Sequence, residues 1–149
     1  MGDFSLSKLS SSGGRQLSLI YGNSEVGEIP DGESNGKAIF IPGTALGALL
    51  SALANKLWKG KVFNRSNGGL INKILGMRLV RAKVFEGVSW SDGKQSIIID
   101  YLSTSLIAFF VRDEIRQVGA GLYLGKAYVR LPFGRRFCAL WFALQFPQR

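Results

Sequence analysis

Histidine is absent from this 149-residue chain, and cysteine occurs once, at position 138. The lack of histidine excludes Ser-His-Asp and Cys-His catalysis within the chain, together with histidine-ligated haem or zinc. A single cysteine excludes an internal disulfide and a thiolate metal site, so we expect no metal and no cofactor. Cys138 lies in the apolar stretch FCALWFALQF, where we expect it to be buried as a small hydrophobic residue. A reducing, cytoplasmic compartment is the default expectation.

Long hydrophobic runs are also missing. No stretch approaches the roughly 18 uncharged apolar residues that a membrane span requires. The N-terminus has no basic region followed by an apolar core, so a signal peptide is not expected. Residues 1–15 are rich in serine and glycine and are predicted to be flexible. Residues 16–149 are predicted to form a single domain.

Acidic residues are scarce, with 10 Asp and Glu against 19 Lys and Arg, which gives a net charge of +9. Such a charge attracts nucleic acid, anionic lipid headgroups or acidic small molecules, or it forms a solvated basic surface without a dedicated partner. One segment contains eight basic residues and no acidic one, and it is the predicted contact for an anionic membrane or nucleic acid. Its basic residues are Lys56, Lys59, Lys61, Arg65, Lys73, Arg78, Arg81 and Lys83.

Short apolar stretches separated by turn residues fill most of the chain, a pattern typical of an antiparallel sheet. The strongest turn is 91–94, which places Asp-Gly between two strand-like segments. Segment 16–21 is predicted as a first strand. Segment 106–118 satisfies both the helical and the strand period, and its β-branched and aromatic residues favour a strand. Seven or eight strands and one helix together predict a small, mainly β, antiparallel barrel.

The one convincing helix covers 45–58. Thr44 provides an N-cap, and leucines recur at helical spacing behind it. We expect this apolar stripe to pack against the barrel as a plug or lid. The alternative is that the helix rests on an anionic membrane. The leucines of the stripe are Leu46, Leu49, Leu50, Leu53 and Leu57.

The segment from Asp92 to Tyr128 resembles a sparsely characterised group of small proteins that share a DGKxxxxxDY…TS…VRDEIRxVxxGLYLGxxY pattern. More loosely, it is similar to the lipocalin-like barrel of proteins with a GXWXG motif. The resemblance implies a lipocalin-like barrel and carries no catalytic residues. An upstream IPxGT…WxGKVF pattern adds Ile41, Pro42, Gly43, Thr44, Trp58, Gly60, Lys61, Val62 and Phe63.

Arg112, Glu114 and Arg116 share one face if their segment is extended. Inside a barrel, this row would form a polar site that anchors a ligand group. On a solvent-facing surface it would form ion pairs of little consequence for stability. Asp113 takes the opposite face.

Other polar candidates lie at strand ends. Asp100 follows an apolar run, so a neighbouring pocket could raise its pKa and suit it to proton transfer, or it could bind turn amides. Tyr101, Tyr123 and Tyr128 could donate hydrogen bonds to a ligand or pack in the core. Trp58, Trp90 and Trp141 are expected to form the core or a pocket wall.

Three functional hypotheses follow. The first is a barrel that binds a small, largely apolar molecule with a polar or acidic group, through Tyr101, Tyr123, Tyr128, Trp90, Trp141 and the row at 112–116. The second is a cofactor-independent isomerase or cyclase that uses Asp100, Glu114 or Tyr123. The third is a basic module for nucleic acid or an anionic membrane, which predicts salt-sensitive binding.

Overall fold

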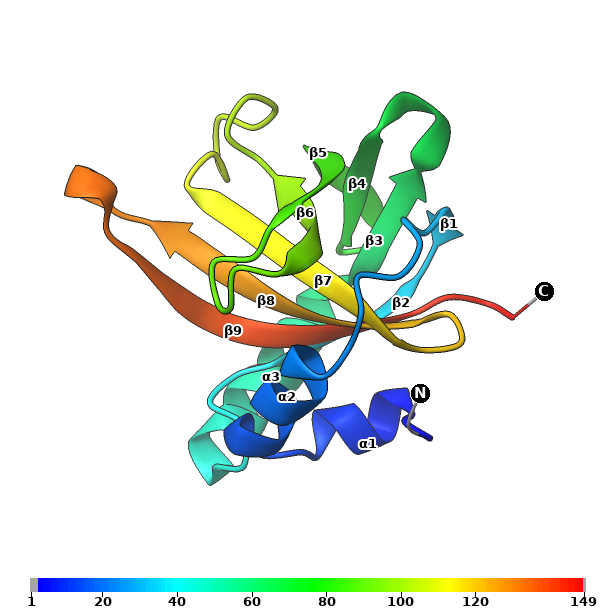
Figure 1. Ribbon diagram of the computed structural model, residues 1–149, viewed down its shortest axis with the longest axis vertical. Coiled ribbons are helices and arrows are strands. Elements are labelled where there is room, and N and C mark those ends of the chain that lie inside the picture. Colours follow the sequence, from blue (N-terminus) through cyan, green and yellow to red (C-terminus); the bar gives the residue numbers. More distant parts are fainter. Residues whose placement is uncertain (1–2, 149) are drawn as a thin grey trace.

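A computed structural model describes residues 3–148, and in it one antiparallel sheet of nine strands curls into a nearly closed barrel (Figure 1). The predicted β-barrel class is confirmed, with nine strands in place of seven or eight. The strands are β1 (Gly32–Glu33), β2 (Asn35–Ile39), β3 (Trp58–Asn64), β4 (Gly69–Ile74), β5 (Met77–Val88), β6 (Gln95–Asp100), β7 (Val111–Gly119), β8 (Leu122–Arg130) and β9 (Arg136–Gln145).

The barrel closes at a single residue, Ser34. Strands β3 to β9 are neighbours in chain order, β1 pairs with β3, and β2 pairs with β9. Ser34 alone separates β1 from β2, and its buried hydroxyl donates to the Lys61 carbonyl oxygen at 2.7 Å. The segment Gly32–Ile39 therefore joins the two edges of the sheet, as closure of a barrel requires.

Alternation along the strands produces two separate cores. The inner core fills the barrel, and the outer core lies between the barrel wall and two N-terminal helices. Gly125 of β8 shows how tightly the inner core is packed, because a Cβ at that position would lie 2.7 Å from Ile115 Cγ2. The inner core includes Phe63, Leu70, Ala82, Val84, Ile97, Ile99, Tyr101, Ile115, Tyr123, Phe142 and Leu144.

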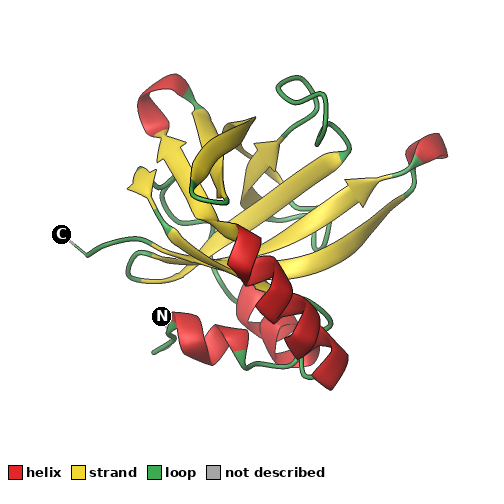
Figure 2. Cartoon of the chain, turned by 180° about the vertical axis from the view of Figure 1, so that it is seen from behind, coloured by secondary structure: helices red, strands yellow, loops and turns green. Residues whose placement is uncertain are grey.

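Helices α1 (Leu6–Ser10) and α2 (Gly14–Gly22) cover the outer core, and Figure 2 shows the α-helices gathered on one side of the barrel, apart from two short 3-10 helices in turns between strands. The predicted strand at 16–21 is therefore wrong. Leu17, Ile20 and Tyr21 are buried, whereas Leu19 is 60% exposed, and this is helical spacing. In the N-terminal segment, Leu9 of α1 is fully buried, while residues 1–2 lie outside the described part of the chain.

Helix α3 (Ala45–Leu57) has the predicted Thr44 N-cap, whose hydroxyl oxygen accepts the Gly47 amide at 3.0 Å. Its polar side faces the barrel: Asn55 Oδ1 accepts the Ala38 amide at 2.7 Å, and Ser51 Oγ accepts the Phe40 amide at 2.8 Å. The expectation that the leucine stripe packs against the barrel is therefore wrong. Leu46, Leu49, Leu53 and Leu57 are each more than half exposed.

The strand predicted at 106–118 is present in its second part only. It begins at Val111, and residues 106–110 belong to the preceding loop. Cys138 is exposed on β9, so its expected burial is wrong. Across residues 3–148, each helix is too short or too polar to cross a membrane.

Candidate functional site

A β-bulge in β3 determines which side chains enter the barrel beside α3. The pairing of β3 with β4 shifts between Trp58 and Gly60, which leaves Lys59 as an extra residue. An extra residue reverses the alternation of side chains, so Trp58 and Lys61 both line the interior. A second shift lies at Val80 of β5, whose carbonyl oxygen accepts the Asn72 side-chain amide at 3.0 Å.

Lys61 is the centre of a buried polar cluster with Asn72, Tyr101 and Asp113, which we call the Lys61 cluster. Lys61 Nζ lies 3.0 Å from Asp113 Oδ2 and donates to Asn72 Oδ1 at 2.9 Å and to the Tyr101 hydroxyl oxygen at 2.6 Å. The Tyr101 hydroxyl accepts from Asn72 Nδ2 at 2.9 Å and donates to Asp113 Oδ2 at 3.3 Å. Each of the three ammonium protons of Lys61 therefore has an acceptor.

Aromatic rings surround the Lys61 ammonium. Its Nζ lies 5.3 Å from the centroid of the Tyr101 ring, 5.4 Å from that of Phe142 and 5.6 Å from that of Trp58. These distances are within the range of cation–π attraction, which is strongest where water is excluded. Trp58 also donates its indole N–H to Asn72 Oδ1 at 3.1 Å. The rings and the hydrogen bonds together hold a positive charge inside the barrel.

Burial and the carboxylate act in opposite directions on the Lys61 ammonium. Burial alone lowers the pKa of Lys61, but the nearby Asp113 carboxylate and the Tyr101 hydroxyl outweigh it, so the pKa lies above the ordinary 10.5. Burial raises the pKa of Tyr101 to about 12, although Lys61 opposes the shift. At neutral pH the cluster therefore holds a charged lysine and a neutral tyrosine.

A cavity of about 290 Å³ lies in the barrel, and the Lys61 cluster forms one polar patch in its lining. This volume is near the lower end of the range of about 300–1,000 Å³ found for small-molecule sites. The cavity is bordered by α3, by β4 and β5 near their turn, by the loop 102–110, and by β8 and β9. Its apolar lining consists of Ala38, Phe40, Ala54, Trp58, Ile74, Val80, Ala108, Val111, Ala127, Leu140 and Phe142.

Asp113 has unused hydrogen-bonding capacity at this cavity. Its Oδ2 binds Lys61 and Tyr101, whereas its Oδ1 is buried and has no hydrogen-bond partner within residues 3–148. A buried carboxylate oxygen without a donor is costly, and native structures rarely leave one in that state. The geometry therefore leaves one strong acceptor open beside an apolar cavity.

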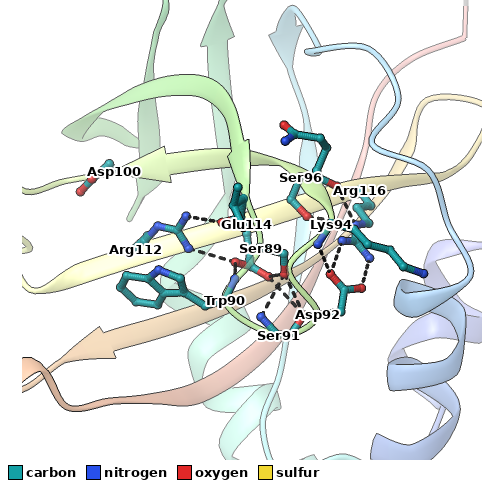
Figure 3. A network of polar contacts seen from close by, with 12 residues as sticks. Ser89, Trp90, Ser91, Asp92, Lys94, Ser96, Asp100, Arg112, Glu114 and Arg116 are labelled. Atoms are coloured by element: carbon teal, nitrogen blue, oxygen red, sulfur yellow. Dashed lines mark hydrogen bonds and ion pairs between the residues drawn. The ribbon is translucent and has the colours of Figure 1, made fainter.

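A second buried network lies on the outer face of β7 (Figure 3). Glu114 is fully buried, and its carboxylate accepts from Arg112 at 3.0 Å, from the Trp90 amide at 2.9 Å and from the Tyr21 hydroxyl at 3.1 Å. The hydroxyl of Ser89 also donates to it. Burial, with the Glu114 carboxylate beside it, raises the pKa of Tyr21 well above its ordinary value.

Arg116 anchors the other end of this network. Its guanidinium forms a bidentate ion pair with the Asp92 carboxylate, with both N–O distances 2.7 Å. It also donates to the Tyr21 carbonyl oxygen at 3.0 Å. The hydrogen bond from Arg116 lowers the pKa of Asp92 to about 2. The network thus fastens α2 and the β5–β6 hairpin to the barrel wall, which is a structural task.

The predicted row of Arg112, Glu114 and Arg116 does share one face of a strand, but the expectation that it lines the barrel interior is wrong. The row faces outward beneath α2 and the β5–β6 hairpin, and its hydrogen bonds go to protein groups. Two of the predicted aromatic residues also lie outside. Trp90 stacks on Arg112, with Arg112 Cζ 4.2 Å from the ring centroid, and Trp141 packs edge-on against Tyr21.

The remaining candidates are dispersed. Asp100 binds Arg130 through both carboxylate oxygens at 3.0 Å. Tyr123 lies in the inner core and donates to the Glu28 carbonyl oxygen at 2.6 Å, away from the cavity. Tyr128 packs against Trp90 on the outer face, with ring centroids 5.5 Å apart. Only Tyr101, among the predicted ligand-binding residues, lines the cavity.

The basic segment is divided by the fold. Lys61, predicted as part of an exposed basic surface, is instead buried in the cluster. Lys73 is half-buried and pairs with Glu33 at 2.9 Å. The other six basic residues of the segment are exposed: Lys56, Lys59, Arg65, Arg78, Arg81 and Lys83.

Within residues 3–148, no three Asp, Glu or Cys side chains gather in a way that could hold a metal ion. Comparison of the chain with family models, with curated proteins and with solved structures gives no match. The resemblance to the GXWXG-motif barrel therefore stays a prediction.

Proposed function

We propose that the barrel binds a small, largely apolar molecule whose polar group donates a hydrogen bond to Asp113. The observation that carries the proposal is the open Asp113 Oδ1 beside a cavity whose walls are apolar outside the Lys61 cluster. Small-molecule sites combine these two features, since the walls supply affinity and a few polar groups fix orientation.

The hydrogen-bonding state of the Lys61 cluster determines the chemistry of the polar group. Lys61, Tyr101 and the Asn72 amide already use their donors within the cluster and with Val80. A carboxylate on the ligand would find no free donor there and would lie beside the Asp113 charge. A hydroxyl, an N–H group or a protonated acid fits the remaining acceptor.

The enzymatic alternative lacks support from the positions of its candidate groups. Asp100 is held by Arg130, Glu114 is enclosed on the outer face, and the Tyr123 hydroxyl is bound to a backbone carbonyl. A general base has to reach the proton that it removes. None of these three residues lines the cavity.

Native mass spectrometry of the protein purified from its own host tests the proposal directly. We expect a stoichiometric small molecule that is released on denaturation and that carries a hydroxyl, an N–H group or a carboxylic acid. A second arm uses N-phenyl-1-naphthylamine, an apolar fluorescent probe with one N–H donor. Its fluorescence should rise on binding at a ratio of one per chain.

Variants distinguish the cavity from the surface. Ala108→Phe and Ala127→Phe place a ring in the cavity from two different segments, so each should abolish probe binding. Ala120→Phe adds the same ring at an exposed position in the β7–β8 turn and should leave binding unchanged. Equal binding by all three variants, with no passenger molecule, would contradict the proposal.

A cytoplasmic location is part of the proposal, because a free and exposed thiol at Cys138 is typical of a reducing compartment. Fractionation of host cells checks it. Recovery of the protein from an oxidising compartment would contradict this part of the proposal without bearing on the cavity.

A further inference from the structure

Large apolar side chains are exposed at one end of the barrel, in the segments that border the cavity. The lining residues Ala54, Ile74 and Ala108 have exposed apolar neighbours in the chain: Leu53 and Leu57, Leu75 and Met77, and Leu106 and Ile107. The hairpin between β8 and β9 adds Leu131, Phe133 and Phe137. We call these segments the apolar rim: the outer face of α3, residues 75–79, the loop 102–110 and the hairpin 131–137, which connect strands at the same end of the antiparallel sheet.

The degree of exposure is unusual for such residues. Leu106 and Phe133 are each 98% exposed, and Ile107 is 79% exposed. On α3, Leu49 is 59% exposed, and three further leucines lie along the same face. Large exposed apolar side chains gathered at one end of a folded protein mark an interaction site, whereas scattered single residues do not.

Phe133 occupies a strained position at the tip of its hairpin. It has a φ of 63°, in the left-handed region that bulky residues avoid. Because the side chain is 98% exposed, packing within the chain contributes almost nothing to offset this strain. Strain without compensating contacts points to a side chain that is presented to a partner.

Charge distinguishes among the surfaces that could cover the rim. The chain has no acidic residue between Glu33 and Glu86 and none after Glu114, and the loop 102–110 has none either. The rim segments therefore carry exposed positive charge alone, from Lys56, Arg78, Arg135 and Arg136. Apolar side chains bordered by positive charge are the combination by which peripheral proteins bind anionic membranes.

We propose that the apolar rim docks the barrel on an anionic lipid bilayer, with the segments that border the cavity toward the lipid. A second copy of the chain fits less well, because it would bring two sets of positive charges together. Nucleic acid fits less well too, because the exposed side chains of the rim are mainly aliphatic, and leucine and isoleucine offer bases no surface for stacking beside the phenylalanines. Docking needs no ligand; entry of the ligand from the bilayer rests on the function proposed above.

Vesicle co-sedimentation tests the docking. The purified protein is mixed with two kinds of vesicle. One consists of phosphatidylcholine alone, and the other also contains about 30% phosphatidylglycerol, which gives its surface a negative charge. We expect binding to the anionic vesicles that weakens as salt rises, and much weaker binding to the neutral ones. Leu106→Ser and Phe133→Ser should each reduce binding by about tenfold, because each removes a side chain that the bilayer would bury.

Matched controls separate the rim from the rest of the surface. Leu19→Ser removes an equally apolar side chain, 60% exposed, from α2 and should leave binding unchanged. Arg135→Glu should weaken binding to anionic vesicles, whereas Lys8→Glu on α1 should have little effect.

The proposal is overturned if neither vesicle binds the protein, if Leu19→Ser weakens binding as much as Phe133→Ser, or if the rim variants abolish only self-association or nucleic-acid binding. Vesicle binding by a protein that carries no passenger and takes up no probe would support docking and refute the cavity proposal. Failure of one is thus distinguishable from failure of the other.

Discussion

The Nζ atom of Lys61 lies 3.0 Å from Asp113 Oδ2, and both side chains are about 95% buried inside the barrel. Taking two charges out of water is costly, so their attraction repays the cost only while both are present. This pair is therefore the point at which the stability of the barrel and the chemistry of its cavity depend on the same atoms.

Removing one partner of the pair should destabilise the protein strongly. Lys61→Met leaves the Asp113 carboxylate buried without its cation, and we expect a loss of about 3–5 kcal/mol in the free energy of unfolding. Urea denaturation followed by tryptophan fluorescence measures it. Lys59→Met, an exposed lysine two residues away, is the control and should change the free energy by less than about 0.5 kcal/mol.

Replacement of Asp113 should affect ligand binding, whereas replacement of its neighbour should not. Asp113→Asn replaces a charged acceptor in the cavity wall, so probe affinity should fall. Glu114→Gln breaks a buried pair with Arg112 on the outer face and should cost about 3–5 kcal/mol of stability. At concentrations of denaturant where the variant is still folded, its probe affinity should match that of the wild type. If Glu114→Gln lost probe binding while Asp113→Asn kept it, the assignment of Asp113 as the ligand-binding residue would be contradicted.

Alkaline pH should destabilise the fold. Burial raises the pKa values of Tyr101, Tyr123 and Tyr128 to about 12, so these groups ionise in the unfolded chain before they do so in the folded one. A raised pKa gives stability that is lost as pH rises above the ordinary value, 10.0 for tyrosine and 10.5 for Lys61. Absorbance at 295 nm should show little tyrosinate until the protein unfolds. Normal titration of the folded protein near pH 10 would contradict this.

Acid should weaken the ion pair between Asp92 and Arg116. The pKa of Asp92 is lowered from 3.8 to about 2, so its contribution to stability is present above pH 3.8 and is lost as pH falls toward 2. The difference in free energy of unfolding between wild type and Asp92→Asn should therefore be constant near neutral pH and shrink over that interval. Asp3→Asn, outside the network, serves as the control. A difference that stays constant down to pH 2 would mean that the pair does not form.

The sequence predicts most strands of this protein because alternation and turn residues are local signals. Residues 77–88 show this, since the alternating residues Ala82 and Val84 both lie in the core. The helix at 45–57 is likewise predicted by its leucine period, but a period identifies a face without stating what covers it. Here the covered face carries Asn55 and Ser51, and the leucines are outside.

The candidate site was predictable only in part, and the reasons are physical. Alternation separates Asp113 from Glu114 but cannot say which face is inside when both carry charges. The outer face of β7 is covered by α2, whose residues 16–21 fit a strand pattern equally well in so short a segment. Lys61 looks like a member of a basic surface, and only the bulge at Lys59, a feature of strand pairing, turns it inward. A lysine within WKGKVF, between apolar residues, is the one sequence signal that could have indicated its burial.

The side chain of Asn55 pairs with the backbone of β2 in the way that a neighbouring strand would. Its side-chain amide accepts from the Ala38 N–H at 2.7 Å and donates to the Ala38 carbonyl at 3.3 Å, so it forms the hydrogen bonds that a neighbouring peptide unit would form. Helix α3 thereby shields the edge of β2 from other chains. Any event that lifted α3 away would expose a row of peptide groups beside Ile39 and Phe40, a template for β-aggregation. The same helix that presents leucines to its surroundings thus also occupies the hydrogen-bonding groups of a strand edge.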